Sequence, residues 1–427
     1  MNEKRRDDFF TLFSPFFPSA SHCRRHRRRS AAPSPHPPSV APPLAAAPPV
    51  PIFGAMKAVL LVGGFSTTLR PITLSLPLPL LEFCNETLLM HQLRALKEAG
   101  VSDVLVCVHE RVVPPTWDAY VRKCEDELGI RIECVKEEEA LGNAGAFKAA
   151  EARITADGSD ESPFIVVNSD VLCTYPLKDL LHTHAKNGLE CTVLTTRCTD
   201  AAALSNYGVV VVDEKTGRVR HFVYRPQTFV SDVINAGVYV LSPCVFRRIE
   251  AGRKVFMQDI LPDLASRGQL QSCLLSGHWV KMTDTSAFLA AVGPHLEIQR
   301  FMKPGSLSAA PSDGSYGIRG DVVIHPEATV GAGSVLGPRV VVGKGCVIGE
   351  GCRVEGSTLL EGTEVKGHSV IKDSLIGWRC EIGGWSHVVG SVFGEEVQVD
   401  EGLLVRGATV LPHKELRESI RTAQIVI

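Results

Sequence analysis

A glycine-rich loop is the first segment of the chain whose residues could do chemistry. It contains Gly63 and Gly64 and continues to Arg70 and Pro71. The loop follows the apolar run Lys57–Val62, which predicts a buried parallel strand. A tight turn at the end of such a strand exposes backbone N–H groups that can bind phosphate oxygens. Because ordinary turns also use paired glycines, the loop needs support from other positions.

Acidic and sulfur-containing residues give no comparable pattern. The run Glu137-Glu138-Glu139 is interpreted as a solvated face rather than a metal cluster. The thirteen cysteines are scattered and include no Cys-x-x-Cys pair. An odd number of scattered cysteines predicts reduced thiols and a cytoplasmic protein.

Alternating strands and helices have to position the loop. The helical spacing of Leu89–Ala99 predicts a helix that ends at Gly100, and a strand over Asp103–Val108 follows. A second helix is predicted over Gly145–Arg153. Further strands are predicted at Arg131–Val135, Phe164–Val167, Cys191–Thr195, Gly208–Val212 and Ala236–Leu241. The alternation predicts an α/β, Rossmann-like domain with a mixed, mostly parallel sheet over residues 56–305.

The last third of the chain repeats every six residues. The first phase of the repeat places an aliphatic residue at Ile324, Val330, Leu336, Val342, Ile348, Val354 and Leu360. After a slip, a second phase continues at Val370, Ile376, Ile382 and Val388. Hexapeptide repeats with one buried aliphatic side chain and a turn glycine predict a parallel β-helix of the left-handed kind over residues 306–427. Such prisms often support oligomers.

Residues 1–55 differ in composition from the rest. They hold 11 of the 27 prolines and the basic run Arg24–Arg29, which predicts a disordered leader. Organelle targeting is the less favoured alternative. The leader has a net charge of +5 and the whole chain −2, so the remainder carries −7. This charge disfavours binding to nucleic acid, and no apolar run reaches the roughly 18 residues needed to span a membrane.

Nine short motifs spread over residues 56–427 support a common interpretation. They are Met56–Gly64, Leu69–Ser75, Pro79–Leu80, Leu141–Gly145, Asn168–Val171, Tyr207–Val210, Asn235–Gly237, Ile376–Trp378 and Val410–Lys414. Together they resemble the sugar-nucleotide pyrophosphorylases, a nucleotidyltransferase family, and most closely its mannose-1-phosphate guanylyltransferases of the eukaryotic catalytic type. The resemblance implies a Mg²⁺-assisted reaction in which mannose 1-phosphate attacks the α-phosphorus of GTP, giving GDP-mannose and diphosphate.

The resemblance also implies roles for individual residues. The nucleotide is expected at Leu61, Gly63, Gly64, Gly142 and Asn143. The sugar is expected at Gly208, Asn235 and Gly237. Catalytic roles are expected for Asp170, Arg225 and Arg70. This chemistry consists mainly of positioning and charge neutralisation, so it depends on charged groups.

Several charged positions of the family are substituted in this chain. Thr68 replaces an Arg that holds the triphosphate, and Leu78 replaces a phosphate-binding Lys. Ser66 replaces a Gly of the signature loop. Tyr224 replaces a Glu that holds the sugar, whereas Arg225 keeps the charge of the family's Lys.

The metal site departs from the family most clearly. The resemblance implies Mg²⁺ between Asp170 and a second Asp, and this second position is Lys281 here. Mg²⁺ is expected only if the protein is active, with Asp284 as the replacement ligand, and otherwise no cofactor is expected. If the two side chains face each other, the Lys281 ammonium is expected to pair with Asp170 and to touch a bound phosphate. The alternative is that Lys281 points to solvent.

Three functions remain open. The first is a catalytically weak or inactive protein, a pseudoenzyme, which binds GTP or GDP-mannose and regulates or scaffolds an active guanylyltransferase paralogue. The second is an active enzyme that uses Arg70 and Asp284 in place of the lost groups. The third is an interaction module built on the β-helix, which could also form homo-oligomers. The preference for guanine and mannose rests on the resemblance alone.

Overall fold

The computed structural model describes residues 56–63, 67, 69–109, 113–137, 142–156, 162–250 and 254–427. These residues all fall within one compact unit, Val50–Ile427. The expected leader, residues 1–55, lies outside the described residues. No helix in the described ranges combines the length and the apolar character needed to cross a membrane.

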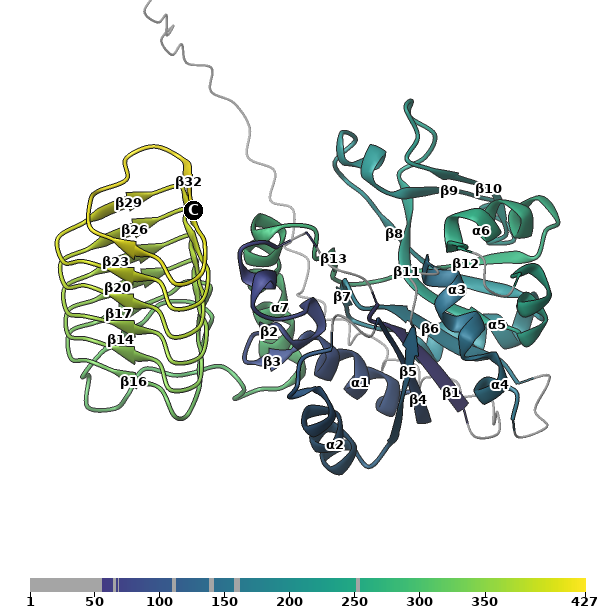
Figure 1. The fold of residues 1–427 in the computed structure, drawn as a ribbon. Coiled ribbons are helices and arrows are strands. Elements are labelled where there is room, and N and C mark those ends of the chain that lie inside the picture. The colour runs from purple at the N-terminus through teal and green to yellow at the C-terminus, as the bar shows by residue number, and fades with distance from the viewer. Residues whose placement is uncertain are drawn as a thin grey trace, which may run out of the picture. The chain divides into compact units, whose positions relative to one another are not determined.

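Within the described residues, nine strands form a mixed sheet (Figure 1). They are β1 (Met56–Leu61), β4 (Val101–His109), β5 (Arg131–Glu137), β6 (Phe164–Asn168), β8 (Cys191–Arg197), β9 (Gly208–Val212), β10 (Val219–Tyr224), β11 (Val233–Leu241) and β12 (Leu270–Leu274). The order is β10-β9-β11-β6-β1-β4-β5, and β8 joins β11 to β12. The strands β6, β1, β4 and β5 are parallel, whereas β11 is antiparallel to its neighbours. The expected α/β sheet is confirmed, with β10 and β12 as additional strands.

The first strand shows why the opening apolar run is continuous. Ala58 and Leu60 pack into the hydrophobic cluster on one face of the sheet. Val59 and Leu61 pack into the cluster on the other face. Because both faces of this central strand are covered, all four positions from Ala58 to Leu61 are apolar.

Seven helices are found in the described ranges. They are α1 (Leu88–Glu98), α2 (Trp117–Leu128), α3 (Gly142–Ala149), α4 (Glu151–Ile154), α5 (Leu177–Asn187), α6 (Met257–Ser266) and α7 (Thr285–Met302). Helix α1 matches the expected Leu89–Ala99 within one residue. The Thr87 hydroxyl caps it by accepting a hydrogen bond from the Met90 N–H at 3.1 Å.

The helix expected over Gly145–Arg153 is wrong in its bounds. The structure has two helices there, α3 and α4, which break at Ala150. The Ala150 N–H donates to the Phe147 carbonyl, a tighter turn than the α-helical one. Helix α3 also begins earlier, because the Val255 carbonyl accepts hydrogen bonds from the Ala144 and Gly145 N–H groups. Because Val255 lies about 110 residues further along the chain, the local sequence could not indicate this start of α3.

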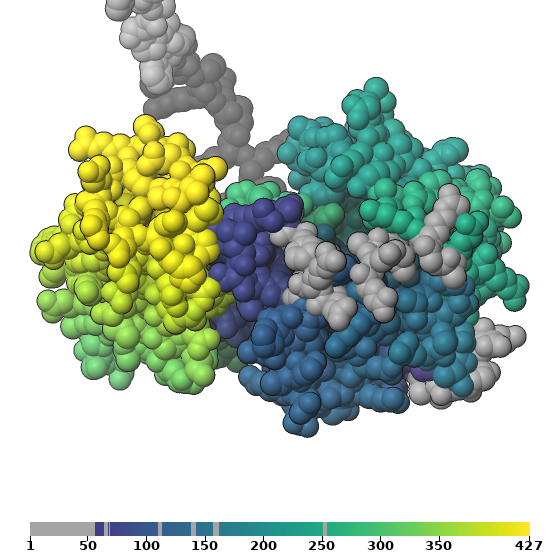
Figure 2. Space-filling model, viewed as in Figure 1, coloured from purple at the N-terminus to yellow at the C-terminus, as the bar shows by residue number. Residues whose placement is uncertain are grey.

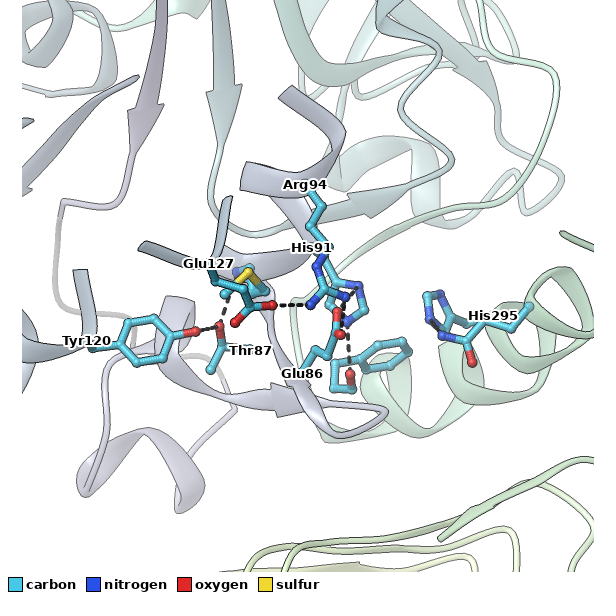
Figure 3. Close-up of polar contacts among 10 residues, drawn as sticks. Glu86, Thr87, His91, Arg94, Tyr120, Glu127 and His295 are labelled. Atoms are coloured by element: carbon cyan, nitrogen blue, oxygen red, sulfur yellow. Dashed lines mark hydrogen bonds and ion pairs between the residues drawn. The ribbon is translucent and has the colours of Figure 1, made fainter. Parts of the chain in front are cut away.

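A polar network joins the start of α1 to α2. The Tyr120 hydroxyl lies 2.5 Å from the Thr87 hydroxyl. The Arg94 guanidinium pairs with Glu86 and, at 2.6 Å, with Glu127. Figure 3 shows these side chains converging between the two helices. The network fixes α1, whose Gln92 side chain donates to carbonyl groups beside the functional residues described below.

The last third of the chain is a β-helix of three parallel sheets (Figure 1). The first sheet contains β14 (Gly317–Ile318), β17 (Val335–Leu336), β20 (Arg353–Glu355), β23 (Val370–Lys372), β26 (His387–Val389) and β29 (Leu404–Arg406). The second contains β15 (Val322–Ile324), β18 (Val340–Val342), β21 (Thr358–Leu359), β24 (Leu375–Ile376), β27 (Val392–Phe393), β30 (Ala408–Val410) and β32 (Gln424–Val426). The third contains β16 (Thr329–Val330), β19 (Val347–Ile348), β22 (Glu364–Val365), β25 (Glu381–Ile382), β28 (Gln398–Val399) and β31 (Glu415–Leu416). The arrangement is consistent with the expected left-handed β-helix, and its coils pack into one continuous surface (Figure 2).

Two expected interior positions of the β-helix are wrong. Leu359 and Ile371 fill the interior in place of Leu360 and Val370. The reason is a change of coil length. Along the second sheet, Val323 pairs with Val341, 18 residues on, but Val341 pairs with Thr358, 17 residues on. Because the coil is one residue shorter, the residue that points to the interior comes one position earlier than a strict six-residue repeat predicts. Leu360 instead packs outside the β-helix core, in a cluster with Phe288 and Trp378.

Candidate functional site

Two neighbouring cavities lie at the carboxyl ends of the central strands, where ligands bind in open α/β sheets. The larger has a volume of about 800 Å³ and is lined by residues that follow β1 and β6 and by the start of α3. The smaller has a volume of about 340 Å³ and is lined by β9, β10 and β11. Four residues line both cavities: Asn143, Asn168, Phe256 and Lys281. These residues mark the boundary between the two.

Most residues expected at the site line these cavities. The larger cavity contains Leu61, Gly63, Arg70, Leu78, Gly142, Asn143, Asp170 and Lys281. The smaller contains Asn143, Gly208, Tyr224, Asn235, Gly237 and Lys281. Gly64, Ser66 and Thr68 lie outside the described residues. The structure therefore brings together residues that are more than 200 positions apart in the chain.

Arg225 is not among the residues that line either cavity. Its backbone has a positive φ of 50° and its N–H donates to the Tyr207 carbonyl at 2.9 Å. The exposed guanidinium lies 5.2 Å from the centre of the Tyr224 ring, in a cation–π contact. The Arg225 guanidinium therefore contacts Tyr224 and lines neither cavity.

Lys281 faces Asp170. The strand β13 (Trp279–Lys281) pairs antiparallel with β7 (Val171–Cys173), and the Met282 N–H donates to the Asp170 carbonyl at 2.8 Å. The Lys281 Nζ lies 3.4 Å from Asp170 Oδ2, with both side chains about one-third exposed. The expected ion pair is therefore present, and the alternative of a lysine directed to solvent is not observed.

These groups do not fit a divalent cation. Among the described residues, no group of three or more His, Cys, Asp or Glu side chains could hold a metal ion. An ammonium about 4 Å from Mg²⁺, at an effective dielectric constant of about 20, is repelled by about 8 kcal/mol. Mg²⁺ also requires oxygen ligands, which Lys281 does not supply.

Asp284 is engaged elsewhere. It is the N-cap of α7 and accepts hydrogen bonds from the Ala287 N–H at 2.9 Å and from the Ser286 and Thr283 hydroxyls at 2.5 and 3.0 Å. Burial, the largest single influence, raises the pKa of this carboxyl, but the hydrogen bonds together lower it below its usual range. Asp284 lines neither cavity. Its geometry is that of a helix cap, which speaks against the substitute ligand considered from the sequence.

The start of α3 is already partly occupied. The Val255 carbonyl accepts the Ala144 and Gly145 N–H groups at 3.1 and 3.2 Å. The Asn143 side chain accepts the Met257 N–H at 2.8 Å. The Ala144 and Gly145 N–H groups are therefore directed to the chain and not to a phosphate.

Glu137 is a site residue that the sequence analysis misinterpreted. Its side chain lines the larger cavity and the residue is only 7% exposed, so the solvated face expected for it is wrong. Glu138 and Glu139 lie outside the described residues. Burial raises the pKa of Glu137 to about 7, and its Oε1 has no hydrogen-bond partner among the described residues. The sequence signal that could have identified Glu137 as a site residue is its position at the end of β5, shortly before the expected nucleotide-binding residues Gly142 and Asn143.

Lys254 is a second site residue that the sequence analysis missed. Its exposed side chain lines the larger cavity, with Nζ 5.4 Å from the centre of the Phe256 ring. The hydrogen bonds of Val255 and Met257 to the start of α3 hold this segment in place. No local pattern marks Lys254, because only tertiary contacts bring it to the cavity.

The smaller cavity has the features expected of a polar ligand site. The Asn235 side-chain Oδ1 accepts a hydrogen bond from the Gly237 N–H at 2.9 Å, and its Nδ2 donates to the Tyr239 hydroxyl at 2.7 Å. Gly237 has a φ of 79°, and a Cβ there would lie 2.9 Å from the Asn168 amide, so only glycine fits. Tyr224 adds an exposed ring to this cavity.

Comparisons with known proteins agree with the motifs. The nucleotidyl transferase family model matches residues 57–294, and the GMPPB C-terminal domain model matches residues 318–426. The mannose-1-phosphate guanylyltransferase catalytic subunit beta of Danio rerio is 39% identical over 373 residues, 87% of this chain and 100% of that protein. The mannose-1-phosphate guanyltransferase of Aspergillus fumigatus is 40% identical over 374 residues, with the same coverage. A solved UDP-glucose pyrophosphorylase complexed with UDP-glucose is 19% identical, with a TM-score of 0.47 over 56% of this chain and 97% of that one.

Proposed function

Because the chain belongs to the mannose-1-phosphate guanylyltransferase family, we propose that it binds GDP-mannose or GTP without turning them over at an ordinary enzymatic rate. In this proposal it regulates or scaffolds an active member of the family. The ligand occupies both cavities, with the nucleoside in the larger, the sugar in the smaller, and the phosphates at their boundary.

The main observation in support of this proposal is the Lys281–Asp170 ion pair. The transfer of a nucleotidyl group needs positive charge that can coordinate several phosphate oxygens at once. At 3.4 Å from Asp170 Oδ2, the Lys281 ammonium takes the carboxylate that a metal ion would need. A lysine is a point charge and cannot act as a six-coordinate template for the attacking phosphate and the leaving diphosphate.

The remaining substitutions act in the same direction. Leu78, at the position of a phosphate-binding Lys, is 5% exposed and packs into a hydrophobic cluster with Leu81 and Phe288. Thr68 cannot supply the charge of the Arg expected there. Removing one such contact typically lowers the rate by about 10²-fold. The loss of several predicts activity near background.

The larger cavity retains features that suit guanine. The Glu137 carboxylate has a buried oxygen with no hydrogen-bond partner among the described residues. Guanine presents N1–H and N2–H donors side by side, and one carboxylate accepts both. Uracil and adenine lack this pair of adjacent donors, so Glu137 supports the preference for a guanine nucleotide.

A turnover assay tests the proposal. The purified full chain is incubated with GTP, mannose 1-phosphate and Mg²⁺, and the release of diphosphate is measured. We expect a rate far below the common enzymatic range, and a rate of about 1 per second or above would overturn the proposal. That result would favour the alternative of an active enzyme, in which Arg70, a lining residue of the larger cavity, supplies the phosphate charge.

The regulatory role is tested by mixing. An active family member is assayed with and without this chain, over a range of GDP-mannose concentrations. We expect the two proteins to elute together in size-exclusion chromatography and the response of the active enzyme to GDP-mannose to change. Separate elution and unchanged kinetics would contradict the role of a partner subunit.

A further inference from the structure

The larger cavity has exchanged its cations. Its ionisable lining residues within the described chain are Arg70, Lys254, Lys281, Glu137 and Asp170. The two phosphate cations lost from the family pattern, at Thr68 and Leu78, belong to the segment that follows β1. Lys254 and Lys281 come from later segments of the chain. Two of the three cations of this cavity therefore come from segments other than the one that follows β1.

Lys281 is held at the boundary between the cavities. The backbone of Lys281 pairs with β7, opposite Val171, and this pairing fixes the position of its Cα. Its Nζ lies 3.4 Å from Asp170 Oδ2. An ammonium group has three N–H donors, and the contact with one carboxylate oxygen engages one side of it. The other side can donate to a ligand that extends from one cavity into the next.

Lys254 is held by the segment that closes the start of α3. Val255 accepts two N–H groups of that helix, and the Phe256 N–H donates to the Asp259 carboxylate at 2.9 Å. The Lys254 ammonium lies over the Phe256 ring, which itself lines both cavities. This places a second cation in the larger cavity, next to one of the residues shared by both cavities.

We propose that Lys281 and Lys254 together replace the divalent cation, so that the site binds a nucleoside diphosphate sugar without any metal ion. The proposal rests on the proposed function, because it takes the two cavities as the site of a sugar nucleotide. Lys281 and Lys254 donate charge-assisted hydrogen bonds to the diphosphate, and Asp170 orients Lys281. A divalent cation is excluded from the position that the Lys281 ammonium occupies.

Isothermal titration calorimetry of the full chain with GDP-mannose tests the inference. The titration is run once with EDTA and once with excess Mg²⁺. We expect the same affinity within about twofold in both. Lys281→Gln and Lys254→Gln are each expected to weaken binding about tenfold or more in both conditions, since each removes a charged hydrogen-bond donor.

A reversal variant sharpens the test. Lys281→Asp restores a second carboxylate beside Asp170, so we expect binding to become dependent on Mg²⁺. Lys178→Gln is the matched control, because Lys178 is exposed on α5 and lines neither cavity. It should bind like the unchanged chain. Thermal unfolding of every variant verifies that the fold is intact.

The outcomes separate this inference from the proposed function. Binding by the unchanged chain only in the presence of Mg²⁺ would overturn the inference and leave the proposed function intact. Unchanged affinity in both Lys→Gln variants would also overturn the inference alone. A folded chain that binds GDP-mannose in neither condition would overturn both.

Discussion

In the β-helix each interior position is repeated in the next coil, whereas each charged position of the cavities occurs once. The column Ile348, Val365, Ile382 and Val399 shows the repetition, with every residue paired to the next in parallel register. The pair of Lys281 with Asp170 has no such equivalent. An interior residue of the β-helix is therefore constrained by its neighbours above and below, whereas a cavity charge is constrained by a single partner, as Lys281 is by Asp170, or by a ligand.

The difference shows which substitutions a fold tolerates. At a corner of the β-helix, a Cβ on Gly377 would lie 2.2 Å from the Gly394 carbonyl oxygen, so a larger residue has no space. By contrast, an uncharged side chain at a position where the resemblance implies a phosphate-binding cation, such as Leu78, is compatible with the packing of the core, because Leu78 is 5% exposed. In the proposed function, the charges of the site change in this way while the architecture is kept.

The largest effect is expected from restoring the lost charges. The triple variant Thr68→Arg, Leu78→Lys and Lys281→Asp should raise turnover of GTP and mannose 1-phosphate by about 10³-fold or more, since each contact is typically worth about 10²-fold. Diphosphate release with Mg²⁺ measures it. Leu78→Lys places a charge at a buried position, so the double variant without it serves as the control for folding. Absence of any gain in well-folded variants would show that more than charge separates this chain from an active enzyme.

A substitution at a corner of the β-helix should have the next largest effect. Gly377→Ala should lower the free energy of unfolding by about 3 kcal/mol, because its Cβ overlaps the backbone of the next coil. Denaturant unfolding measures the change. The control is Gly402→Ala, where φ is 74° but nothing lies within 4 Å of the new Cβ, and only about 1 kcal/mol of strain is expected. Equal losses in the two variants would contradict the steric explanation.

Ligand affinity should depend on pH through Glu137. Burial raises the pKa of Glu137 to about 7 in the free protein, and the N–H donors of guanine favour the ionised form. Affinity for GDP-mannose should therefore rise about tenfold between pH 6 and pH 8. The stability of the fold without ligand should depend on pH in the opposite direction. The raised pKa of Glu137 contributes stability that is present below about pH 4.5 and is lost as the pH rises through 7.

Calorimetry at several pH values measures this dependence. Glu137→Gln should remove it, whereas Glu133→Gln should keep it. Glu133 is the matched control, since it lies on the same strand and pairs with Arg153 outside the cavity. A pH profile that Glu137→Gln leaves unchanged would assign the titration to another group.

The smallest effect is expected at Asp284. Asp284→Ala should lower the free energy of unfolding by about 1 kcal/mol through loss of the α7 cap. Binding of GDP-mannose and its response to Mg²⁺ should not change. A loss of ligand binding in this variant, at unchanged stability, would instead make Asp284 part of the site.

Periodicity predicted most elements of the fold. Seven of the nine strands of the central sheet, the helix α1 and the β-helix were visible as buried runs, helical spacing or six-residue repeats. The errors occurred where a distant contact decides. Val255 determines where α3 begins, and the shortened coils move the interior from Leu360 to Leu359.

The site was predictable only in part, and for a related reason. Gly63, Asp170 and Asn235 lie in motifs, Lys281 stands where the resemblance implies a metal ligand, and all four line the cavities. Lys254 belongs to no motif, and Glu137 was misread because three adjacent acidic residues usually face water.

The amino-acid sequence by itself determined the two architectures, because hydrophobic periodicity is a local property of the chain, and its resemblance to a known family indicated the substituted charges. Only the tertiary structure decided that Lys281 meets Asp170, that Asp284 caps a helix and that Lys254 reaches the cavity. Charge interactions act between groups that folding brings within a few ångströms, and their sign and strength depend on distance and burial, which no linear spacing encodes.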